Sequence, residues 1–285
     1  MNIPKGKLII IGGHEEKGID GERLKIATRN CSHPHPHLKI LSELTSMVPR
    51  AHHIIEIITS ASTIPEQVEE MYRKSYQSVG YNHVKFMRIE NKMQANDIDF
   101  IRRIATCHAV FFTGGDQTRL TTLLNNSLVL KEVNRKYLAD PHFIVAGTSA
   151  GAMAIPETII NGGVIREALM KNDIKMGKGF NLISDIIVDT HFIKRGRFAR
   201  LAHAVALNPT LLGIGLGEDT AFTISKGNEA TCSGSGMVII IDGSEISKTN
   251  ISESDFETPV IIENLKVHII AEENTFLIRE RKFKI

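Results

Sequence analysis

The residues best suited to catalysis surround Ser149, in the pentapeptide Gly147–Gly151 with the sequence GTSAG. It matches the G-x-S-x-G pattern, in which small residues allow a tight turn that lifts a serine hydroxyl clear of the backbone. An apolar run precedes it and a helix-compatible run follows it, which predicts a turn between a strand and a helix. There the amide of Ala150 would stabilise an oxyanion. The alternative is a glycine-rich turn that only packs a helix onto a strand.

A second segment, Asp189 to Arg200, contains a base for such a serine. Serine is a weak nucleophile at neutral pH, and His191 is suited to take its proton because free histidine titrates at about pH 6.5. Arg195, Arg197 and Arg200 follow in sequence, and planar guanidinium groups suit carboxylate recognition. The alternative is a solvated basic helix face, which is the usual meaning of a charge run.

A glycine-containing turn, Thr113–Gln117, directly follows the apolar run Ala109–Phe112. Ligands bind at the carboxyl edge of the strands in open α/β sheets, and this turn is predicted to lie there. Its glycines would let backbone amides approach a substrate carbonyl, while Gln117 offers both a donor and an acceptor. The alternative is a plain turn before a capped helix.

The elements that position these segments follow from the hydrophobic pattern. Short β-branched runs alternate with amphipathic stretches through the first two-thirds of the chain, which predicts a mainly parallel sheet flanked by helices. The expected strands are Lys7–Ile11, Ile54–Thr59, Val84–Ile89, Ala109–Thr113 and Phe143–Ala146. Helices are expected from Pro65 and over Asp97–Thr106, with Asp97 as a cap. After about residue 219, alternating strands that include Met237–Ile241, Lys266–Ile270 and Thr275–Ile278 predict an antiparallel extension of the same sheet.

Composition excludes several classes of protein. The 285 residues show no repeat or linker, so a single domain over 1–285 is expected. Lys and Arg number 34 against 32 Asp and Glu, a balance that argues against nucleic-acid binding. The three scattered cysteines indicate a reducing compartment, and the apolar run Leu8–Ile11 is too short for a signal peptide or a membrane span, so a cytoplasmic protein is expected. His33, His35 and His37 lack a completing ligand nearby and are interpreted as an exposed loop, not a metal site.

Together these segments resemble the cyanophycinase family, serine peptidases that cleave cyanophycin, a polyaspartate with arginine on each side-chain carboxylate. The matching stretches are Ile11–Lys17, Gly114–Gln117, Gly147–Ala152, Asp189–Phe192 with the three arginines, and Gly213–Ala221. They run in family order through most of the chain. The resemblance implies a flavodoxin-like fold of the class I glutamine amidotransferase type, shared with aspartyl dipeptidases, and it suggests a homodimer.

The resemblance also implies a role for each site residue. Ser149 would be the nucleophile, His191 the general base and Glu167 the acid that orients the histidine. The backbone amides at Gly115 and Ala150 would form the oxyanion hole. The residues implied to bind substrate are Gln117, Asp189, Thr190, Arg195, Arg197 and Arg200.

The expected reaction is hydrolysis of an amide bond in a peptide or polymer of aspartate and arginine through an acyl-enzyme, without metal or organic cofactor. The product would be the dipeptide β-aspartyl-arginine. Thr190 stands where cyanophycinases usually have glutamine, and His14 replaces a small residue, so the pocket could be reshaped while the chemistry stays intact. The alternatives are an aspartyl or isoaspartyl dipeptidase acting on small acidic peptides, and a catalytically dead binding relative.

Overall fold

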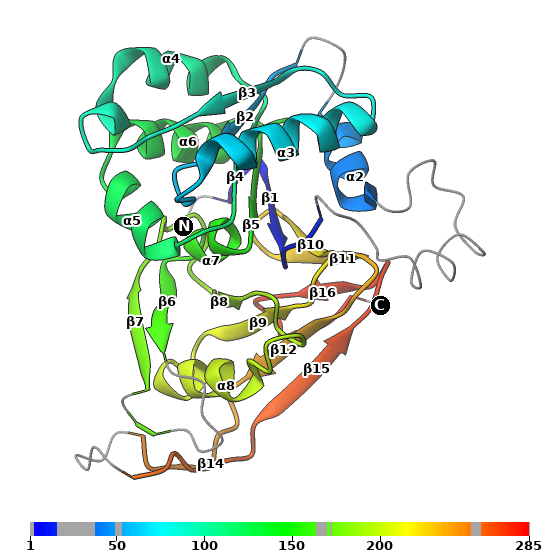
Figure 1. Ribbon diagram of the computed structural model, residues 1–285. Helices are drawn as coiled ribbons and strands as arrows, with labels where there is room; N and C mark the ends of the chain where they lie inside the picture. Colours follow the sequence, from blue (N-terminus) through cyan, green and yellow to red (C-terminus); the bar gives the residue numbers. More distant parts are fainter. Residues whose placement is uncertain are drawn as a thin grey trace.

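A nine-stranded sheet forms the centre of the computed structural model, which describes residues 3–15, 38–48, 53–163, 170–171, 173–251 and 258–284 (Figure 1). Five neighbouring strands are parallel, in the order β1-β5-β4-β2-β3. They are β1 Lys7–Ile11, β2 Ile55–Ile58, β3 Val84–Met87, β4 Ala109–Phe112 and β5 Ile144–Thr148. Each predicted strand is found, with its ends moved by no more than one or two residues. The predicted fold class is therefore confirmed.

Helices cover both faces of this parallel sheet because successive strand residues point to opposite sides. Ile9 and Ile11 of β1 pack with α2 and α3, whereas Leu8 and Ile10 pack with α4 to α7. The helices are α2 Lys39–Met47, α3 Pro65–Ser78, α4 Ile98–Thr106, α5 Gln117–Leu124, α6 Leu128–Ala139 and α7 Ala150–Ala154, with a 3₁₀ turn η2 at Gln94–Asn96. As predicted, Asp97 caps α4 by accepting from the Asp99 amide. No helix in the described part of the chain is long and apolar enough to cross a membrane.

The antiparallel strands fall into two groups, so the predicted single extension is only partly correct. One group continues the large sheet beyond β1 in the order β10-β11-β16-β17. The other is a separate four-stranded sheet, β15-β12-β9-β8, in which β8 and β9 are parallel. The two groups comprise β10 Thr220–Ser225, β11 Glu229–Gly234, β16 Thr275–Leu277 and β17 Lys282–Phe283, then β8 Ile186–Asp189, β9 Leu212–Leu216, β12 Val238–Asp242 and β15 Lys266–Ile270. Two further pairs are β6 Thr158–Gly163 with β7 Ile174–Lys178, and β13 Lys248–Thr249 with β14 Ile262–Glu263.

The four-stranded sheet packs closely on its own helix, α8, which spans Phe198–Leu207 (Figure 1). Glycines on β9 make this possible. A Cβ at Gly213 would lie 2.7 Å from Val205 Cγ2, and one at Gly215 would lie 2.7 Å from the Phe192 ring. Both distances are shorter than any van der Waals contact. Val205 and Phe192 can therefore pack on β9 only because positions 213 and 215 have no side chain.

The turn between β5 and α7 has the same requirement. A Cβ at Gly147 would lie 2.6 Å from backbone atoms of Gly151, and one at Gly151 would lie 2.1 Å from the Phe112 carbonyl oxygen. Both obstacles are backbone atoms, which cannot rotate away. The two glycines of the GTSAG segment therefore set how closely α7 approaches β4 and β5.

We predict that Gly151→Ala lowers the free energy of unfolding by at least about 1–3 kcal/mol, the usual cost of overpacking. Gly162→Ala is the matched control because a Cβ there has no atom within 4 Å. Urea unfolding of both variants measures the difference. Equal unfolding free energies for the two variants would contradict the packing argument.

Candidate active site

Ser149 occupies a strained turn between β5 and α7. Its φ of 51° and ψ of −116° lie outside the regions that non-glycine residues normally adopt. The turn is held by a hydrogen bond from the Ser149 amide to the carbonyl of Ile11, at 3.0 Å. This backbone conformation presents the hydroxyl at the carboxyl edge of β5, as the sequence pattern predicts.

His191 follows β8 and reaches Ser149 from the neighbouring sheet. Its Nε2 lies 2.9 Å from the serine Oγ, and its own amide donates to the Gly12 carbonyl at 2.9 Å. A Cβ at Gly13, which has φ 105°, would lie 2.3 Å from the imidazole Cε1. The histidine therefore occupies space that only a glycine at position 13 leaves open.

Glu218 completes the hydrogen-bonded chain. Its Oε1 lies 2.8 Å from His191 Nδ1, and Lys194 Nζ donates to its Oε2 at 3.1 Å. Because an ionised carboxylate only accepts hydrogen bonds, this contact favours a proton on Nδ1 and leaves Nε2 free to accept from Ser149. Glu167, the acid implied by the resemblance, lies outside the described residues. The sequence signal for Glu218 is its place in the Gly213–Ala221 stretch that resembles the cyanophycinase family.

The electrostatics suit His191 as a base. Burial lowers the pKa of His191 below its ordinary value, although the hydrogen bond to Glu218 acts in the opposite direction. Burial alone would raise the pKa of Glu218, but hydrogen bonds with His191 and Lys194 outweigh it and the pKa is lowered. At neutral pH the imidazole is therefore neutral and the carboxylate is ionised.

Glu15 is hydrogen-bonded to the residue that precedes Ser149. It is fully buried, and it accepts hydrogen bonds from the Thr148 hydroxyl at 2.7 Å and from the Tyr72 hydroxyl at 2.6 Å. Thr148 immediately precedes Ser149, and Tyr72 lies on α3. This carboxylate therefore ties the end of β1 to β5 and to the helix beside the site.

The predicted oxyanion-hole residues flank the nucleophile. Ala150 is the first residue of α7, where a backbone amide has no partner within the helix. In the turn after β4, Gly114 is the glycine next to Ser149, because a Cβ there would lie 3.3 Å from the serine Cβ. Gly115 follows with φ 143° and packs against Ala61. An oxyanion hole at Gly115 and Ala150 stays a prediction.

Two arginines of the basic segment pair with a buried carboxylate. Asp189 is completely buried. Arg197 donates to its Oδ1 at 2.9 Å, and the Arg200 Nε donates to its Oδ2 at 2.8 Å. Both arginines are at least nine-tenths buried. Both guanidinium groups thus pair with one carboxylate inside the protein. The assignment of Asp189, Arg197 and Arg200 to substrate binding stays a prediction.

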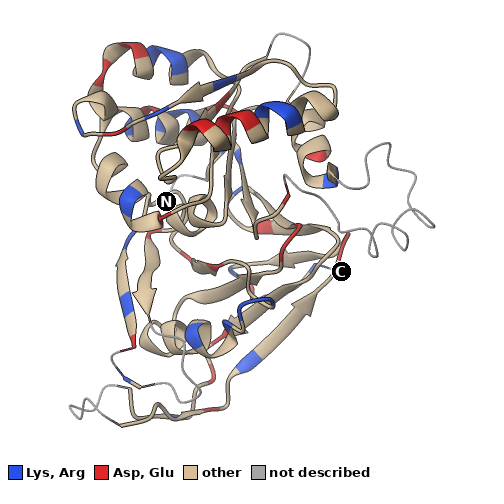
Figure 2. Ribbon diagram, in the orientation of Figure 1, with Lys and Arg blue, Asp and Glu red and all other residues tan. Residues whose placement is uncertain are grey.

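The other expected substrate residues are divided. Thr190 is fully buried, and its role in substrate binding stays a prediction. Gln117 is half-buried, and its amide donates to the Ile160 carbonyl at 3.0 Å. Arg195 is exposed, in the basic loop between β8 and α8 that Figure 2 marks in blue. Arg195 and Gln117 are thus more exposed than the other predicted substrate residues.

A pocket of about 210 Å³ opens beside the nucleophile. It is lined by Gly13, His14, Val68, Met71, Tyr72, Gly114, Thr148, Ser149 and His191. It is small compared with the 300–1,000 Å³ or so of typical ligand pockets. It therefore suits the groups around a scissile bond, while the rest of a long substrate would lie outside it.

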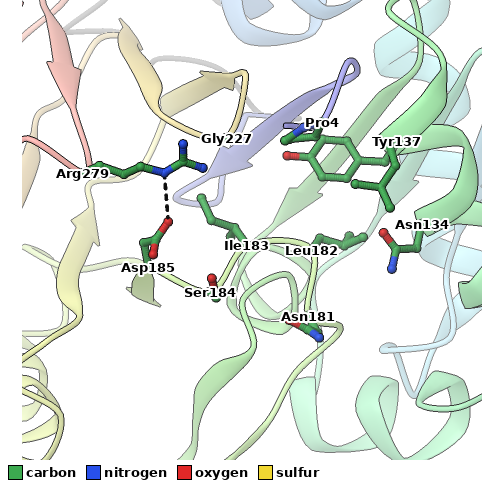
Figure 3. A pocket seen from close by; sticks show the side chains of 11 residues that line it. Pro4, Asn134, Tyr137, Asn181, Leu182, Ile183, Ser184, Asp185, Gly227 and Arg279 are labelled. Atoms are coloured by element: carbon green, nitrogen blue, oxygen red, sulfur yellow. Dashed lines mark ion pairs between the residues drawn. The ribbon is translucent and has the colours of Figure 1, made fainter. Parts of the chain in front are cut away.

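A larger pocket, of about 330 Å³, lies at the opposite edge of the strands (Figure 3). Its lining includes Pro4, just before β1, and Asp185, just before β8. Asp185 is paired there with Arg279 at 3.6 Å. Because ligands of such sheets bind at the carboxyl ends of the strands, the smaller pocket beside Ser149 is the candidate active site.

The fold and the Ser149–His191–Glu218 arrangement define a serine-type hydrolase of the α/β class. The family model of peptidase family S51 matches residues 28–231, and the chain belongs to that family. The cyanophycinase of Synechococcus elongatus is 30% identical over 278 residues, covering 96% of this chain and 80% of its own length. That of Geminocystis herdmanii is 31% identical over 93% and 91% of the two chains. The resemblance to cyanophycinases is thereby confirmed, and the protein is a serine-type peptidase.

Solved structures agree on the fold. A peptidase from an acI-B1 Actinobacterium superposes with a TM-score of 0.61 at 20% identity, covering 94% of this chain and 99% of its own. A putative Peptidase E protein from Listeria monocytogenes gives a TM-score of 0.50 at 15% identity, covering 81% and 99%. At these identities the likeness concerns the fold alone.

We predict that Asp189→Ala lowers the free energy of unfolding by about 3–5 kcal/mol, because it leaves two arginines buried without a partner. Arg195→Ala, in the exposed loop, is the control and should unfold like the parent. Urea unfolding makes the comparison. If Asp189→Ala keeps its stability and loses only kcat/KM, the result contradicts a structural role and favours the substrate-binding assignment.

Replacing each glutamate by glutamine tests whether Glu218 or Glu167 orients His191. Glu218→Gln should lower kcat by roughly 10³–10⁴-fold, as in other triads whose histidine loses its orienting carboxylate. Glu167→Gln should change kcat little. Steady-state kinetics of both variants is the measurement, and the reverse order of effects would return the role to Glu167.

Proposed function

We propose that this protein hydrolyses cyanophycin to β-aspartyl-arginine dipeptides through an acyl-enzyme on Ser149. The observation that carries the proposed chemistry is the continuous chain Ser149 Oγ to His191 Nε2 at 2.9 Å and His191 Nδ1 to Glu218 Oε1 at 2.8 Å. The polymer substrate is supported by relatives named cyanophycinase that align with 96% of the chain.

In the first half of the reaction, His191 Nε2 takes the hydroxyl proton as Ser149 Oγ attacks the carbonyl carbon. Glu218 stabilises the imidazolium that forms. The amides at Gly115 and Ala150 would stabilise the tetrahedral oxyanion. The imidazolium then gives its proton to the leaving amine, and the acyl group remains on Ser149.

In the second half, a water molecule loses a proton to His191 and attacks the acyl carbon. The imidazolium returns this proton to Ser149 as the acid product leaves. Neutral His191 is the competent form in both halves, which suits the lowered pKa of its imidazole. None of these steps needs a metal or an organic cofactor.

Recognition of the substrate would begin at the exposed basic loop. Lys194 has 64% of its side chain exposed, and Arg195 is exposed beside it. Both lie within four residues of His191. They are therefore placed to attract the carboxylates of an aspartate-rich peptide, and Gln117 would add a hydrogen bond from the turn after β4.

A dipeptidase or isoaspartyl peptidase is the second candidate. The observation in its favour is the pocket volume of about 210 Å³, which suits a short peptide as well as a chain end. Retention of the complete serine, histidine and acid chain argues against a binding protein without activity. The proposal includes a cytoplasmic homodimer that acts on peptide and does not bind nucleic acid or membranes.

We predict that Ser149→Ala folds normally and loses at least about 10³-fold in kcat, because only the attacking oxygen is removed. Circular dichroism checks the fold, and labelling by a fluorophosphonate should occur in the parent and not in the variant. A variant that keeps most of its activity would contradict the serine mechanism.

Substrate choice is measured separately from mechanism. Rates on cyanophycin granules and on β-aspartyl dipeptides are compared for the parent, with Ser149→Ala as the blank. Faster turnover of the polymer, with β-aspartyl-arginine as product, supports the proposal. Turnover of dipeptides alone favours the second candidate.

A further inference from the structure

A second histidine lies beside the His191–Glu218 pair. His14 Nε2 is 3.4 Å from Glu218 Oε1, and the rings of His14 and His191 meet edge to face with centroids 5.5 Å apart. One ligand atom from each of these three residues falls within 4.8 Å of the others. Peptide hydrolysis as derived above uses His191 and Glu218 but gives His14 no task.

We propose that His14, His191 and Glu218 form a binding site for Zn²⁺, and that zinc bound there inhibits the enzyme. Two imidazoles and one carboxylate are a common zinc ligand set, with bonds of about 2.0–2.2 Å in a tetrahedral arrangement. Such bonds place neighbouring ligand atoms about 3.3–3.5 Å apart. The His14–Glu218 distance of 3.4 Å already fits.

His191 must adjust to admit the ion. Its Nδ1 is 2.8 Å from Glu218 Oε1, so these two atoms must move apart, while the ligand atoms of His14 and His191, which lie within 4.8 Å of each other, must reach the same spacing. His14 has 34% of its side chain exposed and lines the pocket beside Ser149. The ion can therefore enter from the pocket, and its fourth position faces solvent there.

Positive charges near the site set a limit on affinity. Lys194 contacts the other carboxylate oxygen, Oε2, at 3.1 Å, which leaves Oε1 to the ion. Its side chain is 64% exposed and can move away. Arg195 lies in the same exposed loop. These charges oppose a cation, so binding should tighten as salt screens them.

Zinc would inhibit the enzyme by changing which nitrogen of the His191 ring carries the proton. In the resting enzyme Nδ1–H donates to Glu218 and Nε2 accepts from Ser149. A metal on Nδ1 takes that lone pair, so the ring proton moves to Nε2 through solvent. The hydrogen bond to Ser149 then runs in the opposite direction, because Nε2–H is now the donor. A ring in this state cannot take the serine proton.

The first test measures binding without turnover. Calorimetric titration of Zn²⁺ into full-length Ser149→Ala, which keeps all three proposed ligands, should give one site. Adding His14→Gln should weaken that site by at least about tenfold, the lower range for disturbing metal coordination. His142→Gln, at an exposed position before β5, is the control and should bind like the parent. Equal zinc affinity with and without His14 overturns the proposal.

The second test measures inhibition without assuming a substrate. The rate of fluorophosphonate labelling of Ser149 should fall on adding Zn²⁺ and recover on adding EDTA. In His14→Gln, labelling relative to the variant's own zinc-free rate should be at least about tenfold less sensitive to zinc. Zinc sensitivity that is lost in a His33, His35 and His37 triple glutamine variant, and kept in His14→Gln, assigns the metal elsewhere and overturns the proposal.

Only the inhibition by zinc rests on the proposed serine chemistry, whereas zinc binding does not. If cyanophycin proves not to be the substrate, both tests keep their meaning. If Ser149 proves not to be the nucleophile, the labelling test fails while the calorimetric test still decides whether the three residues bind zinc.

Discussion

The catalytic arrangement depends on the absence of side chains in the turn that follows β1. A Cβ at Gly12 would lie 1.7 Å from the Gly217 carbonyl oxygen, and one at Gly13 would lie 2.3 Å from the His191 ring. This turn also makes backbone hydrogen bonds to the other segments of the site. The Gly12 carbonyl accepts from His191, the Gly13 carbonyl accepts from Asp219, and the preceding Ile11 carbonyl accepts from Ser149. Ser149, His191 and Asp219, the residue after Glu218, are thus all hydrogen-bonded to one short stretch of backbone.

Much of this could be predicted from the sequence because the signals are local. Each of the five parallel strands of the large sheet was predicted from its β-branched run, whereas the parallel pair β8 and β9 was not. The turn at Ser149 was predicted from small residues flanking a serine. The acidic partner of His191 could not be predicted in this way. Glu218 is far from His191 in sequence, and no local pattern says which of several carboxylates reaches the imidazole. Only the parallel pairing of β8 with β9 brings the two residues together.

The arginines show a second limit of sequence reasoning. A run with several basic residues is read as a surface, yet two of its three arginines point inward to Asp189. The pattern that separates them is helical: Arg197 and Arg200 are three residues apart at the start of α8 and share one face, whereas Arg195 precedes the helix. The sequence shows that spacing but not the position of Asp189 beneath it. Both guanidinium groups share the one buried carboxylate, so loss of Asp189 would leave two buried charges without an ionic partner, which would be costly.

The nucleophile and its base belong to different sheets. Ser149 follows β5 of the nine-stranded sheet, while His191 and Glu218 follow β8 and β9 of the four-stranded sheet. Strand spacing within one sheet fixes the distance between base and acid, whereas the distance from base to nucleophile spans the junction of the two sheets. That junction is bridged by the end of β1, because the Ser149 amide donates to the Ile11 carbonyl and the His191 amide to the Gly12 carbonyl. One sheet cannot tilt against the other at this point without breaking those two backbone hydrogen bonds.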